Sequence, residues 1–95
     1  MADYVPPAEL VEAQQALDAA MRACEQLASE LPAWSAIQRG EAEPDLDGEQ
    51  RLADARAERA RLMDRVYGDE WLKRADNWLQ AKQALEKAAR ADVAS

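Results

Sequence analysis

Histidine and phenylalanine are absent from this 95-residue chain, and cysteine occurs once. Histidine is the commonest general base and a frequent metal ligand, so its absence removes most routes to catalysis and to a transition-metal centre. The chain also has no glycine-rich loop of the kind that holds a phosphate. We therefore predict a protein that is not an enzyme, with no catalytic residues, no cofactor and no bound metal.

Glycine and proline are scarce, with three and four residues, and they lie outside the periodic segments. A turn-rich β fold needs many more such breaks. A single cysteine and the lack of an N-terminal apolar run predict a cytoplasmic protein with no signal peptide and no membrane contact. Cys24 itself falls on the apolar face of the first predicted helix, where we expect a buried, inert thiol.

Large apolar side chains are few as well, because 22 residues are alanine whereas leucine, isoleucine and valine together total 15. Alanine is the strongest helix former, and its small side chain lets helices approach closely. We therefore predict an all-α fold, a small antiparallel helical bundle or hairpin that forms a single domain over residues 1–95. Since its core would be thin, we also expect a homodimer in which a second copy supplies apolar contacts.

The first predicted helix covers residues 7–30. Pro7 suits the first helical position because its missing N–H would have no partner within the helix. An apolar row follows at heptad spacing, as in a coiled coil: Leu10, Leu17, Cys24 and Leu31. Pro32 disfavours the helical conformation at the residue before it, so we expect the helix to end there, with a short extension over 32–39 before a cap at Gly40.

Two further helices are predicted over residues 48–67 and 69–91, after an acidic loop over 40–47. Arg59 interrupts the apolar face of the first of them. We expect its stem to pack on that face while its guanidinium pairs with an acid of the first helix. A break with Asp69 as the N-cap gives three helices, whereas a continuous helix gives a two-helix hairpin; we favour the break.

The last predicted helix carries two of the three tryptophans. Trp71, Trp78 and Leu85 stand one heptad apart, and Leu72 and Leu79 form the adjoining column. Tryptophan has the largest apolar surface of any side chain. We therefore expect both tryptophans to lie mainly in the core.

Charge is divided unevenly along the chain. The formal net charge is −7, with 11 acids and 2 bases in residues 1–50 against 8 acids and 10 bases in residues 51–95. The simpler interpretation is internal, with the acidic first helix pairing with bases of the second half. The alternative is an acidic surface that attracts a basic partner. Nucleic-acid binding is not expected, because phosphate contacts need clustered lysine or arginine.

Five acids stand at alternate positions in and just after the predicted loop: Glu41, Glu43, Asp45, Asp47 and Glu49. Glu43, Asp45 and Asp47 match early positions of a calcium loop of the EF-hand type, with Asp54 at its twelfth position. The first position lacks the usual aspartate and the twelfth lacks the longer glutamate. We therefore favour a solvated turn in which Asp47 caps the next helix, with Gln50 in the capping-box position.

These features predict a helical module that binds another protein, or a second copy of itself. The acidic loop would steer it to a basic surface, and the adjacent apolar side chains would supply the lasting contact. The predicted partner-binding residues are Glu41, Glu43, Asp45, Asp47, Glu49, Trp34 and Ile37. The alternative is an acidic inhibitor or nucleic-acid mimic that fills a basic groove of its target, such as an accessory protein of a phage or mobile element.

Overall fold

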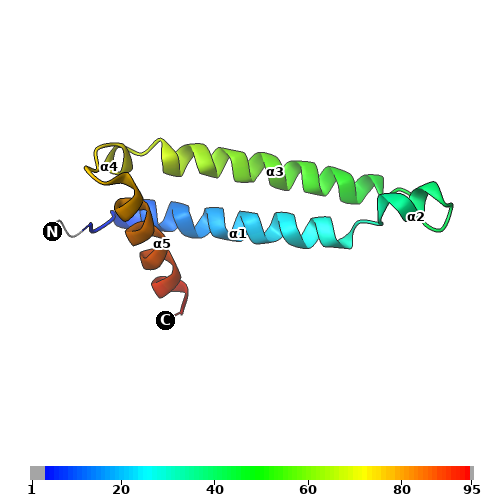
Figure 1. The fold of residues 1–95 in the computed structure, drawn as a ribbon, viewed down its shortest axis with the longest axis horizontal. Helices are drawn as coiled ribbons and strands as arrows, with labels where there is room; N and C mark the ends of the chain where they lie inside the picture. Colours follow the sequence, from blue (N-terminus) through cyan, green and yellow to red (C-terminus); the bar gives the residue numbers. More distant parts are fainter. Residues whose placement is uncertain (1–3, 95) are drawn as a thin grey trace.

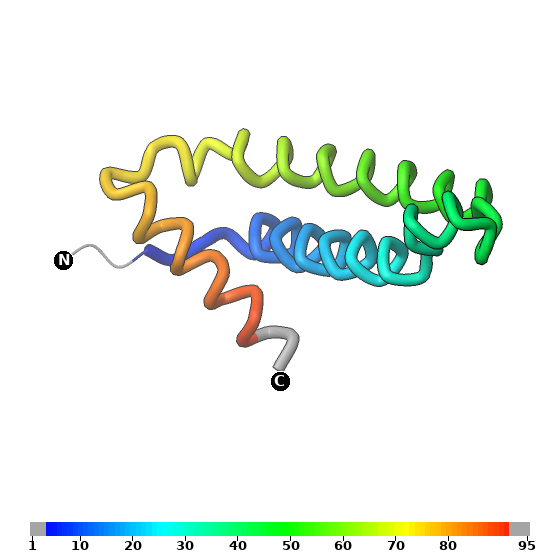
Figure 2. The backbone as a smooth tube through the Cα atoms, turned by 45° about the vertical axis from the view of Figure 1, so that its right-hand side comes forward, coloured from blue at the N-terminus to red at the C-terminus, as the bar shows by residue number. Residues whose placement is uncertain are grey.

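The computed structural model in Figure 1 describes residues 4–94, and the side chains of residues 4–91. Its elements are α1 (Ala8–Glu30), α2 (Trp34–Gln38), α3 (Leu46–Tyr67), α4 (Glu70–Lys73) and α5 (Trp78–Ala94). The residues so described contain no strand, which confirms the predicted all-α class. α1 and α3 form a long antiparallel hairpin, and α5 crosses α1 near its N-terminal end (Figure 1, Figure 2).

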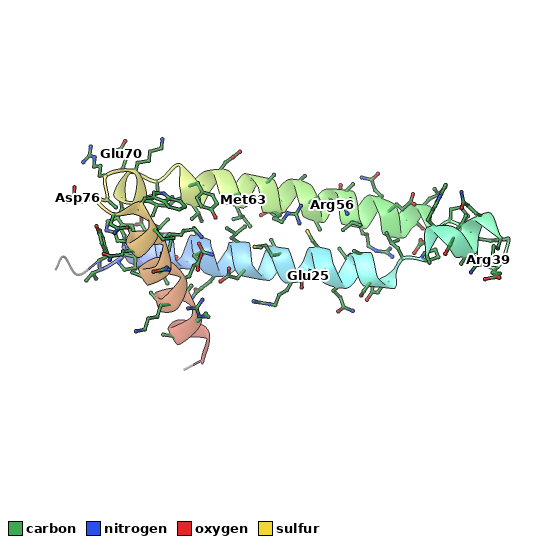
Figure 3. All side chains as sticks on the ribbon, in the orientation of Figure 1. Glu25, Arg39, Arg56, Met63, Glu70 and Asp76 are labelled. Carbon is green, nitrogen blue, oxygen red and sulfur yellow. The ribbon has the colours of Figure 1, made fainter. Side chains whose placement is uncertain are left out.

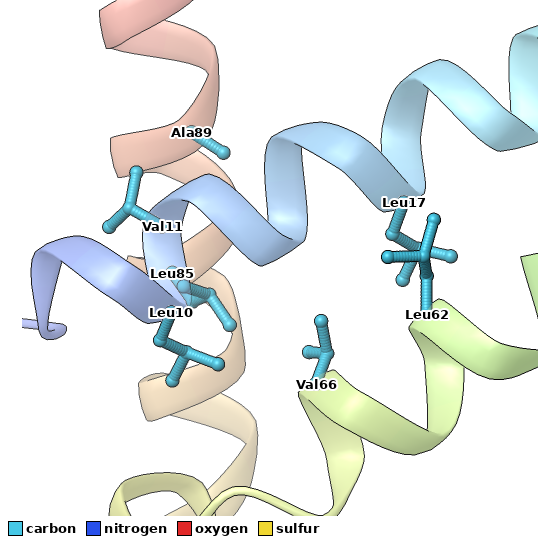
Figure 4. Packing of buried hydrophobic residues seen from close by; sticks show 7 residues of the cluster. All are labelled: Leu10, Val11, Leu17, Leu62, Val66, Leu85 and Ala89. Atoms are coloured by element: carbon cyan, nitrogen blue, oxygen red, sulfur yellow. The ribbon is translucent and has the colours of Figure 1, made fainter.

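The core lies at the end of the hairpin where α5 crosses it. Figure 4 shows Leu17 of α1 meeting Leu62 of α3, while Leu10 lies beside Leu85 of α5. The full cluster is Leu10, Val11, Leu17, Leu62, Val66, Leu85 and Ala89. Cys24, farther along α1, is a buried free thiol as predicted. The buried members of the α1 row, Leu10, Leu17 and Cys24, are thus covered within the same chain and need no second copy to bury them.

Local chemistry sets the ends of α1 and α2. Leu31, which precedes Pro32, is extended at φ −77° and ψ 145°, as the steric clash with proline requires. α2 ends at Gln38 with Arg39 as its C-cap, and the next residue, Gly40, has a φ of 73° in the left-handed region. The Gly40 N–H donates to the Ile37 carbonyl at 3.1 Å and the Glu41 N–H to the Ala36 carbonyl at 2.9 Å, a Schellman motif. The predicted cap at Gly40 is confirmed.

The residue that caps the start of α3 is a different aspartate from the predicted one. Asp45, not Asp47, is the N-cap, and its carboxylate accepts the Gly48 N–H at 2.9 Å. Gly48 is buried, and a Cβ at that position would lie 2.8 Å from the Asp45 side-chain carbon and 2.9 Å from Leu31 Cδ2. The cap therefore depends on a glycine that lets the two helices approach closely at this end of the hairpin.

The second half of the chain breaks twice. α3 ends at Tyr67, and Asp69 caps α4 by accepting the Trp71 N–H at 2.9 Å, so the favoured break is confirmed. The predicted helix over 69–91 is wrong, however, because α4 ends at Lys73. Asn77 then caps α5, which begins at Trp78. The Asn77 side-chain oxygen accepts the Gln80 N–H at 3.1 Å, and this hydrogen bond favours a new helix start over a continuous helix.

This second break changes which residues enter the core. Trp71 is partly buried against the cluster, and Leu85 is fully buried. Trp78 remains 46% exposed and Leu79 60%, so the prediction that Trp78 lies mainly in the core is wrong. Heptad spacing across residues 71–85 places side chains on one face only if the helix is continuous. The turn before Trp78 interrupts the helix, so Trp71 no longer shares a helix face with Trp78 and Leu85.

The molecule is long and thin, with extents of 59 × 27 × 19 Å. Its radius of gyration is 17.6 Å, against about 12 Å for a compact domain of this length. Away from α5 the long contact is that of α1 with α3. Within residues 4–94 no helix is both long enough and apolar enough to cross a membrane.

Candidate functional site

The end of the hairpin farthest from both termini carries the predicted partner-binding residues, and we call residues 34–49 the acidic tip (Figure 1). α2 has no buried residue, so it adds nothing to the core. Trp34 on this helix is 70% exposed, and Ile37 is half-buried. Leu46, at the start of α3, is 72% exposed. Leu46 was not among the predicted partner-binding residues, although an apolar residue between two aspartates is a sequence signal for such a role.

The five carboxylates of the tip do not share one role. Arg39, labelled at this end in Figure 3, donates two hydrogen bonds of 2.9 Å to Glu41. This hydrogen-bonded pair lowers the pKa of the Glu41 carboxyl. Asp45 is occupied as the N-cap of α3. The other three, Glu43, Asp47 and Glu49, are exposed. Glu41 is exposed too, so four of the five predicted acids are presented to solvent, while Glu41 and Asp45 also hold the tip in shape.

A calcium loop does not fit this geometry. α3 begins at Leu46, so Asp47 and Asp54 are both helical and cannot wrap around one ion with Glu43. Asp54 instead accepts a hydrogen bond of 3.0 Å from Gln50, one turn earlier. Among the residues with described side chains, no group of three or more acids or thiols is placed to hold a metal.

Charge pairing inside the molecule is local. The ion pairs of the described residues join partners two to four positions apart: Arg39–Glu41, Arg61–Glu58, Arg65–Asp69, Arg74–Glu70 and Lys82–Glu86. None of these pairs connects α1 with α3 or α5, and none involves Arg59, so the prediction that Arg59 pairs with an acid of the first helix is wrong. The described acids of residues 1–50 are therefore not neutralised by bases of the second half.

The structure defines an all-helical protein, a two-helix hairpin closed at one end by shorter helices, with an exposed acidic tip at the other end. The model of the family described as domain of unknown function DUF8825 matches residues 9–88, and the chain belongs to that family. No curated protein and no solved structure matches the chain.

Proposed function

We propose that this protein is a non-enzymatic interaction module that recognises another protein through its acidic tip. The observation that carries the proposal is Trp34, exposed to 70% on a helix without a buried residue. Tryptophan is enriched among the residues that dominate binding energy at interfaces. A side chain of this size that is left mostly exposed is best explained by contact with a partner.

Charge defines the kind of partner. Residues 39–49 hold five acids and one base, so the matching surface is an apolar pocket with lysine or arginine at its rim. Long-range attraction acts on the association rate and is screened beyond about 8 Å at physiological ionic strength. Burial of Trp34 and Leu46 acts on the dissociation rate and is not screened in this way.

We further propose that the protein is cytoplasmic, because it has a single cysteine, and that it forms a homodimer, because the elongated chain exposes a large surface.

The second candidate function is the acidic inhibitor or nucleic-acid mimic. A mimic needs rows of freely exposed carboxylates, whereas Glu41 and Asp45 are engaged within the tip and apolar side chains lie beside them. We therefore place it second.

The experiment begins with capture of partners from the native host and then measures binding rates with tip variants. Trp34→Ala is expected to raise the dissociation rate about tenfold or more, since a central aromatic contact contributes at least 1.4 kcal/mol. Val5→Ala is the control because Val5 is 78% exposed near the chain's N-terminus, far from the tip. Equal dissociation rates for wild type and Trp34→Ala would refute the tip as the binding site.

The contribution of the tip carboxylates to the association rate is tested separately. The test uses the three acids that neither cap α3 nor pair with Arg39. Replacing Glu43, Asp47 and Glu49 by their amides should slow association and flatten its salt dependence, with dissociation nearly unchanged. The same change at Glu9, Glu12 and Glu25, exposed acids of α1, alters net charge equally and should have a smaller effect. Equal effects of the two triple variants would mean that only net charge matters.

A further inference from the structure

A second group of exposed apolar side chains lies at the opposite end, where α5 crosses the hairpin. Tyr67 and Trp78 stack with ring centroids 6.1 Å apart and planes 23° apart. Lys82, one turn after Trp78, lies 5.0 Å from the centre of the Tyr67 ring and pairs with Glu86. Met63 is one turn before Tyr67 on α3, where Figure 3 labels it.

This surface continues onto α1. Glu86 lines a depression of about 310 Å³ together with Met21, Asp18, Arg22 and Arg90. We call the apolar side chains of this region the junction face: Met21, Met63, Tyr67, Trp78 and Leu79, which are 37–60% exposed. They come from α1, α3 and α5, and this arrangement arises only because α5 folds back across the hairpin (Figure 2).

The charges around the junction face nearly cancel. Asp18 and Glu86 are offset by Arg22 and Arg90 in the same depression, and Lys82 brings the total to three bases against two acids. The Lys82 ammonium is shielded from water, which disfavours its charge, but its contacts with Glu86 and Tyr67 outweigh this and raise its pKa. The acidic tip, in contrast, would repel the tip of another copy. A second copy can therefore approach this face against only weak like-charge repulsion.

The surface area of the chain also suits a second copy. The chain exposes 6776 Å², whereas a compact monomer of 10.6 kDa exposes about 5,500 Å². This excess of about 1,300 Å² belongs to the elongated chain as a whole, and a standard interface buries roughly 800 Å² of each partner. A two-fold dimer places the same patch of both copies in contact, so an apolar face with nearly balanced charge can complement itself.

We propose that the junction face is the interface of a two-fold homodimer, in which Trp78 and Leu79 of each copy pack against the junction face of the other. This inference rests on the homodimer of the proposed function and names the surface that forms it. The dimer leaves both acidic tips free, at the ends of the hairpins away from the interface. One assembly therefore presents two partner-binding sites, which increases avidity for a partner that repeats its own site.

Sedimentation equilibrium from about 1 μM to about 1 mM protein tests the interface with two matched pairs of variants. Leu79→Lys and Leu46→Lys place the same charge on exposed leucines at opposite ends, and Trp78→Ala and Trp34→Ala remove exposed tryptophans in the same way. The junction variants should weaken the dimer at least tenfold, and the tip variants should leave it unchanged. Circular dichroism verifies that each variant keeps its helices.

Each other outcome rejects the proposal at a defined step. A wild-type chain that is monomeric over the whole range rejects the homodimer. A dimer that survives both Leu79→Lys and Trp78→Ala rejects the junction face while the homodimer stands. A dimer lost with Leu46→Lys or Trp34→Ala instead assigns the contact to the tip. The binding rates of Trp34→Ala with a captured partner are measured independently, so failure of the tip is distinguishable from failure of the interface.

Discussion

Asp45 and Asp47 have the same side chain two positions apart, but only Asp45 caps α3. The difference is backbone conformation: Asp45, at φ −101° and ψ 87°, lies outside the helix and can turn its carboxylate toward the Gly48 N–H. Asp47 is already helical, and its carboxylate is exposed. An aspartate cap in acidic surroundings is predictable from the sequence, but the choice between Asp45 and Asp47 depends on where the helix starts, which the two identical side chains do not reveal.

Stability measurements distinguish the two aspartates. Asp45→Ala should lower the free energy of unfolding by about 1 kcal/mol, because it removes the cap. Asp47→Ala should lower it by only a few tenths of a kcal/mol, since a carboxylate in the first turn interacts only with the helix dipole. Urea titrations followed by circular dichroism at pH 7 give both values. Equal losses, or a larger loss for Asp47→Ala, would contradict the observed start of α3.

The elements that most changed the expected core are α4 and α5. A single helix over 69–91 would have aligned Trp71, Trp78 and Leu85 on one face. The turn capped by Asn77 separates Trp71 from the other two, and the Tyr4 hydroxyl supports that turn by accepting the Asn77 N–H at 2.9 Å. α5 is then free to cross α1, where Ala81, Leu85 and Ala89 are buried on its inner side.

Because of this arrangement, Leu85 is expected to contribute more to stability than Trp78, although the heptad spacing predicts both in the core. Leu85→Ala should cost about 2–5 kcal/mol, because a fully buried leucine leaves a cavity. Trp78→Ala should cost about 1 kcal/mol, chiefly the loss of its stack on Tyr67, measured on dilute protein where the chain is monomeric. Thermal and urea unfolding of both variants provide the comparison. A larger loss for Trp78→Ala would place that side chain in the core after all.

At the scale of the whole molecule, stability is expected to be uneven along the hairpin. The end crossed by α5 has three helices and the principal core cluster. Toward the tip, the buried residues of the hairpin are Cys24, Gly48 and Leu52, so few side chains are shielded from water. Local opening should therefore begin at the tip, where the proposed partner site lies.

Hydrogen exchange measures this gradient directly. In dilute protein, the amides of residues 14–17 of α1 should exchange about tenfold or more slowly than those of residues 26–30 of the same helix. Both segments have the same backbone hydrogen bonding, so the comparison isolates tertiary packing. Uniform protection along α1 would show that the two-helix part of the hairpin is as stable as the part beneath α5.

The sequence by itself determined the features that depend on neighbouring residues. Alanine-rich composition and scarce glycine and proline gave an all-α chain, and Pro32, Gly40 and Asp69 set helix ends because their steric and hydrogen-bonding effects act over a few positions. It also placed Trp34 beside five acids. Whether those side chains would be exposed was not a local property, because exposure depends on what the rest of the chain covers.

The tertiary structure alone decided which faces are buried and which remain available. Trp78 and Leu85 occupy the same heptad row in sequence, but the direction of α5 after Asn77 buries Leu85 against α1 and leaves Trp78 half-exposed beside Tyr67. The ion pairs likewise formed along the chain and not between the helices. Burial and pairing are set by residues far apart in sequence, and the energy that selects among such arrangements arises only when the helices pack.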